Sequence, residues 1–281
     1  MSIDNFIPEV WSSRILETFD RAHVYAKVCN RDYEGDISQF GDTVRINSVG
    51  DPTVAAFTKN TNIAAVEELE DSQTVLVIDK ANYFNFQVDD VDKRQQQPKG
   101  VMAEAVQRAS FKLSDSADTD LAAVISAGVA TANIKTAITS GFAPEDAYDL
   151  IVDLWVLLME NDVPDESLWV VVPPRFKGYL KKDDRFVSFG TDANRNAAIR
   201  GDAFGEVNGM KVYTSNNVPV SSNAYDILAG HMSAVSYAEQ ILKTVAYSPE
   251  LRFSDALKGL HVYGRKVIRP YALSKCVVTM P

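Results

Sequence analysis

A long stretch of helical sequence constrains this chain more than any other feature. Between Pro98 and Ala127 there is no proline, and the only glycine, Gly100, lies near the start. Apolar residues recur at helical spacing through this stretch, from Val101 and Val106 to Leu121 and Ile125. Roughly 30 residues give a rod of about 45 Å, far longer than the usual globular helix of about 11–12 residues. The sequence therefore predicts a helix that forms the spine of an elongated subunit.

The segment before this helix, residues 33–79, predicts a long hairpin. Strand-like pieces at residues 43–46 and 74–78 bracket a polar stretch that contains Gly50-Asp51-Pro52 and Lys59-Asn60. An isolated hairpin is only marginally stable in water, so such an extension needs a neighbour to lie upon. The pattern is thus a first indication of obligate assembly.

Two further elements flank the hairpin and the long helix. Residues 82–89 alternate cleanly, with Phe84, Phe86 and Val88 on one face, which predicts a half-buried strand. Residues 6–28 carry apolar side chains at helical spacing, and Pro8 suits a helix start. We expect a short amphipathic helix on an N-terminal arm.

The second half of the chain predicts a compact α+β region. Its expected elements are a helix within 141–161 that begins at Pro144, a buried strand at 168–172, a short helix over 175–182, a hairpin turn at Asn208-Gly209, and strands at 225–229 and 234–237. The end of the chain, residues 260–279, is again strand-rich. We expect these last strands to return and pack on the long helix and on the strand at 84–88, because no local helix covers them.

Composition excludes several classes of protein. The 281 residues are 46% hydrophobic and 23% charged, which is ordinary globular composition. The most apolar stretch, residues 150–159, is interrupted by Asp153, and the first four residues lack the features of a signal peptide, so we expect no membrane partner.

Cys29 and Cys276 form neither a disulfide framework nor a metal-ligand spacing, and we expect both to be buried. A net charge of −10 argues against a sequence-reading nucleic-acid binder, although an anionic inner wall would suit a container for DNA.

The chain offers little material for catalysis. Its three histidines, His23, His231 and His261, lie in no catalytic or zinc motif. Asp89, Asp90 and Asp92 lack the ligand spacing of a calcium loop. There is no phosphate-binding loop either. We therefore predict no catalytic, cofactor or metal residues. The alternative that stays open is a hydrolase or transferase built from scattered acids, which would be a compact monomer with a polar cleft.

The order of these parts resembles the Hong Kong 97 (Johnson) fold of tailed-bacteriophage major capsid proteins, over essentially the whole chain. Five segments are also similar in detail to one group of siphophage capsid proteins: Phe6-Ile7-Pro8-Glu9-Val10-Trp11, Tyr83-Phe84-Asn85-Phe86-Gln87-Val88-Asp89-Asp90, Trp169-Val170-Val171-Val172-Pro173-Pro174, Lys211-Val212-Tyr213-Thr214-Ser215-Asn216-Asn217-Val218-Pro219 and Gly259-Leu260-His261-Val262-Tyr263-Gly264. No single segment is chemically diagnostic, but their joint occurrence in this order is fairly specific.

The resemblance implies an α+β subunit with a defined division of the chain. It places an N-terminal arm at 1–35, an extended loop at 36–80, a peripheral domain with the spine helix at 81–135 and 245–281, and an axial domain at 136–244. Such subunits would assemble as hexamers and pentamers into the icosahedral head that encloses double-stranded DNA, so the chain would be made in the bacterial cytoplasm and end in the virion. The nearest alternative is an encapsulin, a bacterial shell of the same fold that stores an enzyme.

The resemblance also suggests partners and contact residues. A separate scaffolding protein is implied, because the chain starts almost directly at Phe6 and leaves no room for a fused scaffolding segment. A portal and cement proteins are further candidate partners, and contacts with DNA would be non-specific. The candidate inter-subunit contacts are Trp11, Arg14, Lys59, Glu67, Glu68 and Arg94. Lys59 is the natural candidate for a covalent crosslink, but no asparagine or assisting glutamate can be identified, so we expect none.

Overall fold

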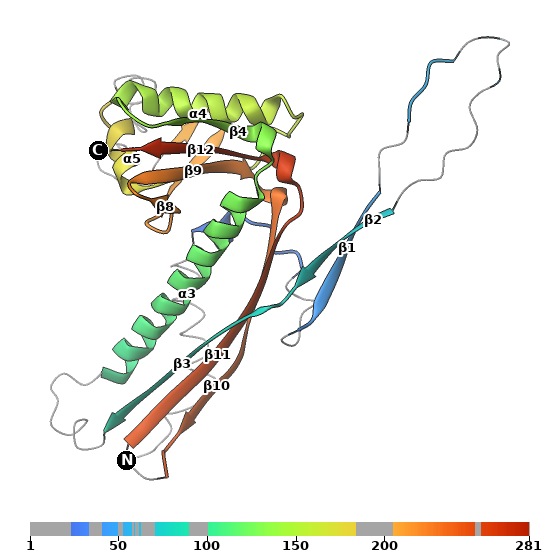
Figure 1. The fold of residues 1–281 in the computed structure, drawn as a ribbon. Helices are drawn as coiled ribbons and strands as arrows, with labels where there is room; N and C mark the ends of the chain where they lie inside the picture. The colour runs from blue at the N-terminus through green and yellow to red at the C-terminus, as the bar shows by residue number, and fades with distance from the viewer. Residues whose placement is uncertain are drawn as a thin grey trace.

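The computed structural model describes residues 24–33, 41–49, 53–57, 59, 62, 71–89, 101–183, 205–250 and 254–280. Three parts can be followed in Figure 1: a layered body near the C-terminus, an elongated part built on a long helix and long strands, and a two-stranded extension on one side. The chain leaves the elongated part at the end of the long helix and returns to it later, so the two parts are interwoven.

The elongated part combines the spine helix with a three-stranded sheet. Helix α3 (Val101–Gly128) confirms the predicted long helix and is about 42 Å long at the usual rise. The sheet has the order β10 (Val235–Tyr247), β11 (Ser254–Val267), β3 (Lys80–Asp89), and both pairings are antiparallel. The predicted start of the helix near Pro98 lies outside the described residues.

Strand β3 alternates as its sequence predicts. Phe84 and Phe86 pack with Val106 of α3 and Leu257 of β11, while Tyr83 on the opposite face is exposed. Gly259 lies opposite Phe84, and a Cβ at this glycine would lie 2.4 Å from the Phe84 ring. The ring therefore occupies the space that a larger residue at position 259 would need.

The layered body contains a mixed seven-stranded sheet covered by helices. Its order is β4 (Ile134–Ile138), β12 (Leu273–Thr279), β9 (Ala224–His231), β5 (Leu168–Val172), β7 (Met210–Thr214), β6 (Glu206–Val207), and β8 (Val220–Ser221) pairs with β9. Helix α4 (Pro144–Met159) lies across the sheet in Figure 1, and α5 (Pro174–Leu180) packs beside it. Short 3₁₀ turns lie at η1 (Tyr25–Lys27), η3 (Thr131–Asn133), η4 (Met232–Ala234) and η5 (Pro270–Ala272).

Several local predictions for this body are confirmed. All five residues of β5 are buried, as the uninterrupted apolar run Leu168–Val172 indicates. Helix α4 begins at Pro144, where the carboxylate of Asp146 accepts the backbone N–H of Ala143 at 2.7 Å. Asn208 and Gly209 both have positive φ, 48° and 77°, which is the conformation of a type I′ hairpin turn between β6 and β7.

The C-terminal strands are only partly as expected. The prediction that they pack on the long helix and on residues 84–88 is confirmed for β11, which pairs with β3 and contacts α3. It is wrong for β12, which pairs with β9 and β4 in the seven-stranded sheet. The 3₁₀ turn at Pro270 separates the two strands, and the buried residues Leu273, Cys276 and Val278 find their cover in the layered body. Strand β10 also runs well beyond the predicted 234–237.

The predicted hairpin is present as a separate antiparallel pair. Strands β1 (Thr43–Val49) and β2 (Asp71–Val77) pair from Thr43 opposite Val77 to Val49 opposite Asp71. We call residues 43–77 the extension. It projects away from both other parts in Figure 1. Most of the predicted N-terminal helix at 6–28 lies outside the described residues, and its described end is the 3₁₀ turn η1.

Candidate functional site

The outer part of the extension exposes apolar side chains to solvent. Val54 is 94% exposed and Phe57 is 76% exposed, and both lie in the segment between the end of β1 and the start of β2. Nearer the base of the extension, Val75 and Val77 on β2 are exposed as well. Large apolar side chains gathered on a projecting element, without cover from their own chain, are typical of an interaction surface. Lys59, one of the predicted contact residues, is exposed in the same region.

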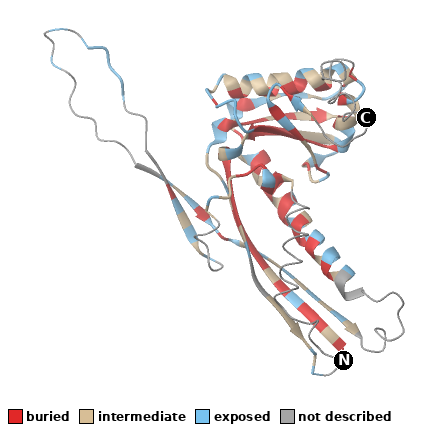
Figure 2. Cartoon of the chain, turned by 180° about the vertical axis from the view of Figure 1, so that it is seen from behind, coloured by how far each residue is buried: buried red, intermediate tan, exposed pale blue. Residues whose placement is uncertain are grey.

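The base of the extension is buried against the elongated part. Ile46, Leu76 and Ile78 form a small cluster with Ala238 of β10 and Val262 of β11. In Figure 2 the buried positions of the extension lie at this end, whereas exposed positions continue outward. The subunit thus fixes one end of the extension and leaves the other end uncovered.

A buried carboxylate anchors the N-terminal segment on the spine helix. Asp118 of α3 is 1% exposed, and its carboxylate accepts the backbone N–H groups of Val24 at 3.1 Å and Tyr25 at 2.8 Å. The side chain of Asn217 also donates to it at 3.4 Å. Burial raises the pKa of Asp118 from 3.8 to about 6, although these hydrogen bonds work in the opposite direction. The same burial, together with the nearby Asp118, raises the pKa of Tyr25.

A second polar network ties the same segment to the three-stranded sheet. Glu239 of β10 accepts the hydroxyl of Tyr237 at 2.7 Å, contacts His261 Nε2 at 3.2 Å and forms an ion pair with Arg31. Asn30 completes the attachment, since its N–H donates to Val235 and its carbonyl accepts the N–H of Tyr237. Arg31 therefore pairs within its own chain.

A third network joins the end of the spine helix to the layered body. Lys275 of β12 lies 3.3 Å from the carboxylate of Asp226 on β9 and 3.0 Å from the Ser126 hydroxyl of α3, which itself donates to Asp226. The lysine ammonium thereby bridges two strands and the helix. All three networks connect parts of one subunit.

His231, His261 and the two cysteines have structural roles. His261 is buried beside Glu239, and His231 accepts the backbone N–H of Ser233 at 3.1 Å. Both cysteines are free and buried, as predicted, and burial raises the pKa of the Cys276 thiol to about 11. Within the part of the chain that the structure describes, no group of three or more His, Cys, Asp or Glu side chains could hold a metal ion. No helix of that part is long and apolar enough to cross a membrane.

Most of the predicted contact residues cannot be placed. Trp11, Arg14, Glu67, Glu68 and Arg94 lie outside the described residues. Sequence reasoning missed Asp118 and Glu239, the two carboxylates that attach the N-terminal segment within the subunit. Asp118 did carry a signal, because it is a carboxylate within the apolar stripe of α3, three residues before Leu121.

Comparison with known proteins identifies the kind of subunit that carries these features. The family model described as phage capsid protein matches residues 70–276. The chain belongs to this family. It is a major capsid protein that self-associates in the head of the virion, and its role is structural and not enzymatic. The hydrolase or transferase alternative is thereby set aside.

Solved structures support the fold of this capsid protein independently. A chain from Mycobacterium phage Che8 is 28% identical, with a TM-score of 0.74 over 91% of this chain and 90% of that chain. The capsid structure of the cyanophage P-SCSP1u is 15% identical, with a TM-score of 0.72 over 92% and 89%. A virus-like particle from Pyrococcus furiosus is 12% identical, with a TM-score of 0.54 over 95% and 96%. The predicted Hong Kong 97-like α+β fold is confirmed. No curated protein matches the sequence.

Proposed function

We propose that this capsid protein forms a closed icosahedral shell around double-stranded phage DNA, in which the extension of each subunit lies over a neighbour. The observation that carries the proposal is the uncovered apolar surface of the extension at Val54 and Phe57. A two-stranded hairpin of this kind gains stability only when a further surface covers it. A neighbouring subunit in the shell supplies that surface.

The proposed division of the chain follows the strand pairings. The extended loop corresponds to 36–80. The peripheral domain corresponds to α3 with the three-stranded sheet, which extends the expected 245–281 segment back to the start of β10 at Val235. The axial domain corresponds to the seven-stranded sheet with α4 and α5, so the expected 136–244 segment ends before β10 at Val235 and β12 is added to it.

The proposed partners go beyond the subunit itself. We expect a separate scaffolding protein, a portal and cement proteins, with DNA contacted non-specifically. The net charge of −10 supports loose packaging, because an anionic wall repels phosphate. Trp11, Arg14, Lys59, Glu67, Glu68 and Arg94 stay the proposed contacts between subunits.

Electron microscopy of the purified chain, expressed alone and with a candidate scaffolding protein, tests the proposal. We expect uniform closed shells, or capsomers that convert to shells, with light scattering reporting their mass. Particles from infected cells should hold nuclease-protected DNA. Shells that hold an enzyme and no DNA would contradict the packaging role, and a strictly monomeric protein under all conditions would contradict assembly.

Deletion of residues 51–67 tests the role of the extension. The deletion removes Val54, Phe57 and Lys59 but keeps both strands of the pair and the buried base. We expect a folded subunit with an unchanged far-ultraviolet circular dichroism spectrum and no shells. Normal shells from this variant would overturn the assignment of the extension.

A further inference from the structure

The root of the extension passes unusually close to the strand beneath it. The chain runs from β2 through Ile78 and Asp79 into β3, and it crosses β11 at Gly264. A Cβ at Gly264 would lie 2.5 Å from the carbonyl oxygen of Val77 and 2.6 Å from Cδ1 of Ile78. Real Cβ atoms do not approach a backbone oxygen so closely. Only glycine lets the root lie against β11 in this position.

The next residue, Arg265, holds the same root by charge. Its Nη1 lies 2.8 Å from Asp79 Oδ1 at the root, and its Nε lies 2.6 Å from Asp120 Oδ2 on the spine helix. The guanidinium also lies 5.8 Å from the centre of the Tyr263 ring, whose hydroxyl donates to Asp120. The arginine side chain is 9% exposed, whereas its partners Asp79 and Asp120 are 54% and 30% exposed, so the arginine is packed but the two carboxylates reach solvent. One guanidinium therefore joins the extension, the helix and the sheet.

Because the extension is long, a small change of its angle at the root displaces its far end. At the root, the N–H of Gly41 donates to the Ile78 carbonyl, and the N–H of Ile78 donates to the Asp42 carbonyl, so both strands are tied together there. Seven residues of strand reach about 20–24 Å from that point. A tilt of about 15° at the root would move the far end by about 5 Å, which is roughly one strand spacing. Small errors at the root would therefore misplace the surface that a neighbour must meet.

We propose that Arg265, seated by Gly264, is a positioning residue that sets the direction in which the extension leaves the subunit. The inference rests on the proposed role of the extension in contacting a neighbour. Arg265 is well suited to this task because its planar fork can engage two carboxylates from different elements, whereas a lysine ammonium is a single point of charge. Loss of the contacts of Arg265 with Asp79 and Asp120 would leave the subunit folded, but the extension would point in a different direction.

The direction of the extension can be measured in the soluble subunit with two spin labels. Cysteines at Gln73 on β2 and Lys112 on α3 accept labels, because both positions are exposed while the native Cys29 and Cys276 are buried. We expect one narrow distance distribution in the parent protein. Arg265→Gln should shift or broaden it, and Asp79→Asn, which removes only the negative charge at the root, should do the same. Arg108→Gln on the exposed face of α3 is the matched control and should leave the distribution unchanged.

Assembly gives the second readout. We expect Arg265→Gln and Gly264→Ala each to lower the yield of closed shells at least tenfold per amount of soluble protein, with Arg265→Lys restoring part of the yield. Unchanged distances and normal shells in both Arg265→Gln and Asp79→Asn would overturn the inference. If those variants assemble normally while the deletion of residues 51–67 does not, the inference about Arg265 is wrong and the proposed role of the extension is not affected. Normal shells from the deletion would contradict the proposed function itself.

Discussion

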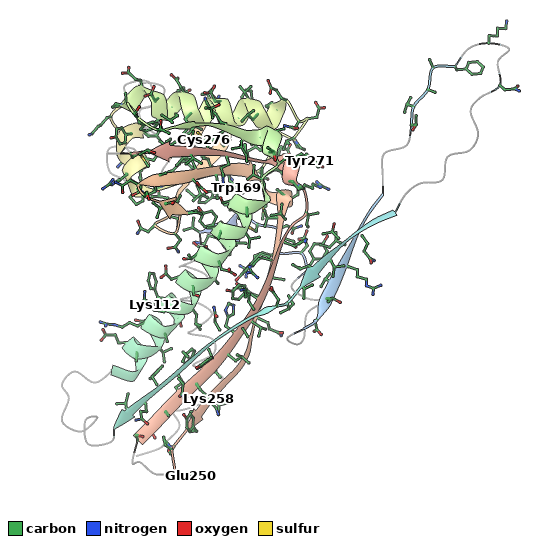
Figure 3. All side chains as sticks on the ribbon, viewed as in Figure 1. Lys112, Trp169, Glu250, Lys258, Tyr271 and Cys276 are labelled. Atoms are coloured by element: carbon green, nitrogen blue, oxygen red, sulfur yellow. The ribbon has the colours of Figure 1, made fainter. Side chains whose placement is uncertain are left out.

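The seven-stranded sheet and the extension bury their apolar side chains in different ways. In the sheet, β5 is buried along its whole length, and α4, α5 and the neighbouring strands supply the cover. Among the described side chains of the extension, burial is confined to the base around Leu76, while Val54 and Phe57 face solvent. Figure 3 shows Trp169 and Cys276 within the layered body, far from the projecting strands.

This difference separates what one chain can stabilise from what requires a second chain. The sheet completes its hydrophobic core with residues of the same subunit, so its stability does not depend on assembly. A two-stranded pair has no second layer, and its outer part would gain its cover only on association. We therefore expect mutations in the two regions to affect different measurements.

The largest loss of stability should follow truncation in the layered body. Trp169 is among the largest fully buried side chains, so Trp169→Ala should lower the free energy of unfolding by about 3–5 kcal/mol. Urea unfolding of the soluble subunit measures this change. Val156→Ala, on the partly exposed side of α4, is the control and should cost less than about 1 kcal/mol. Equal losses at the two positions would break the assignment of the core.

The next largest effect should be a dependence of stability on pH that originates at Asp118. Its folded pKa of about 6 exceeds the ordinary 3.8, so the folded state binds the proton more tightly than the unfolded state. The stabilisation is complete below about pH 4 and is lost as the pH rises through 6, with a total of about 3 kcal/mol.

Asp118→Asn isolates this effect, because the amide cannot titrate and the other carboxylates are unchanged. The difference in unfolding free energy between the two proteins should change by up to about 3 kcal/mol from pH 4 to pH 7, in favour of the variant at the higher pH. Parallel stability curves would contradict this origin. Since Asp118 lies on α3 and holds residues 24–25, hydrogen exchange in the extension should not follow the titration.

The sequence predicted those elements whose signal is local. The stripe of α3, the apolar run of β5, the alternation of β3 and the Asn208-Gly209 turn each specify a conformation within a few residues, and each is confirmed. Strand β12 shows the limit of such signals. Its alternation indicates a strand with a buried face, but it does not specify which of two sheets supplies the partner strands.

The networks that position the parts were beyond sequence reasoning for the same reason. Asp118 meets Tyr25 across 93 residues, and Arg265 meets Asp79 across 186. The charge of each residue was visible, but its partner depends on the folded topology. Of the predicted contact residues, Lys59 alone falls within the described part of the chain, where it is exposed, and its role as a contact stays a prediction.

A smaller and local loss should follow truncation at the base of the extension. Leu76→Ala truncates a fully buried side chain of the base cluster and should cost about 2–3 kcal/mol, because so small a cluster can partly collapse. Hydrogen exchange should show reduced protection of β1 and β2 and unchanged protection of Leu168–Val172. Reduced protection in both regions would mean that the two fold as one cooperative unit.

The smallest effect on stability, and the sharpest contrast between the regions, is expected at Phe57. Because its side chain is already exposed in the subunit, Phe57→Ser should change the free energy of unfolding by less than about 0.5 kcal/mol. The same change should lower the yield of closed shells at least tenfold, because it removes apolar surface that a neighbour would bury. Phe57→Leu keeps an apolar side chain and should retain most of the yield. Sedimentation of assembly reactions, with urea unfolding of the same preparations, measures both quantities.

Full assembly of Phe57→Ser would mean that the exposed ring is not part of the contact, and that neighbours hold the extension by its backbone or by charges such as Lys59.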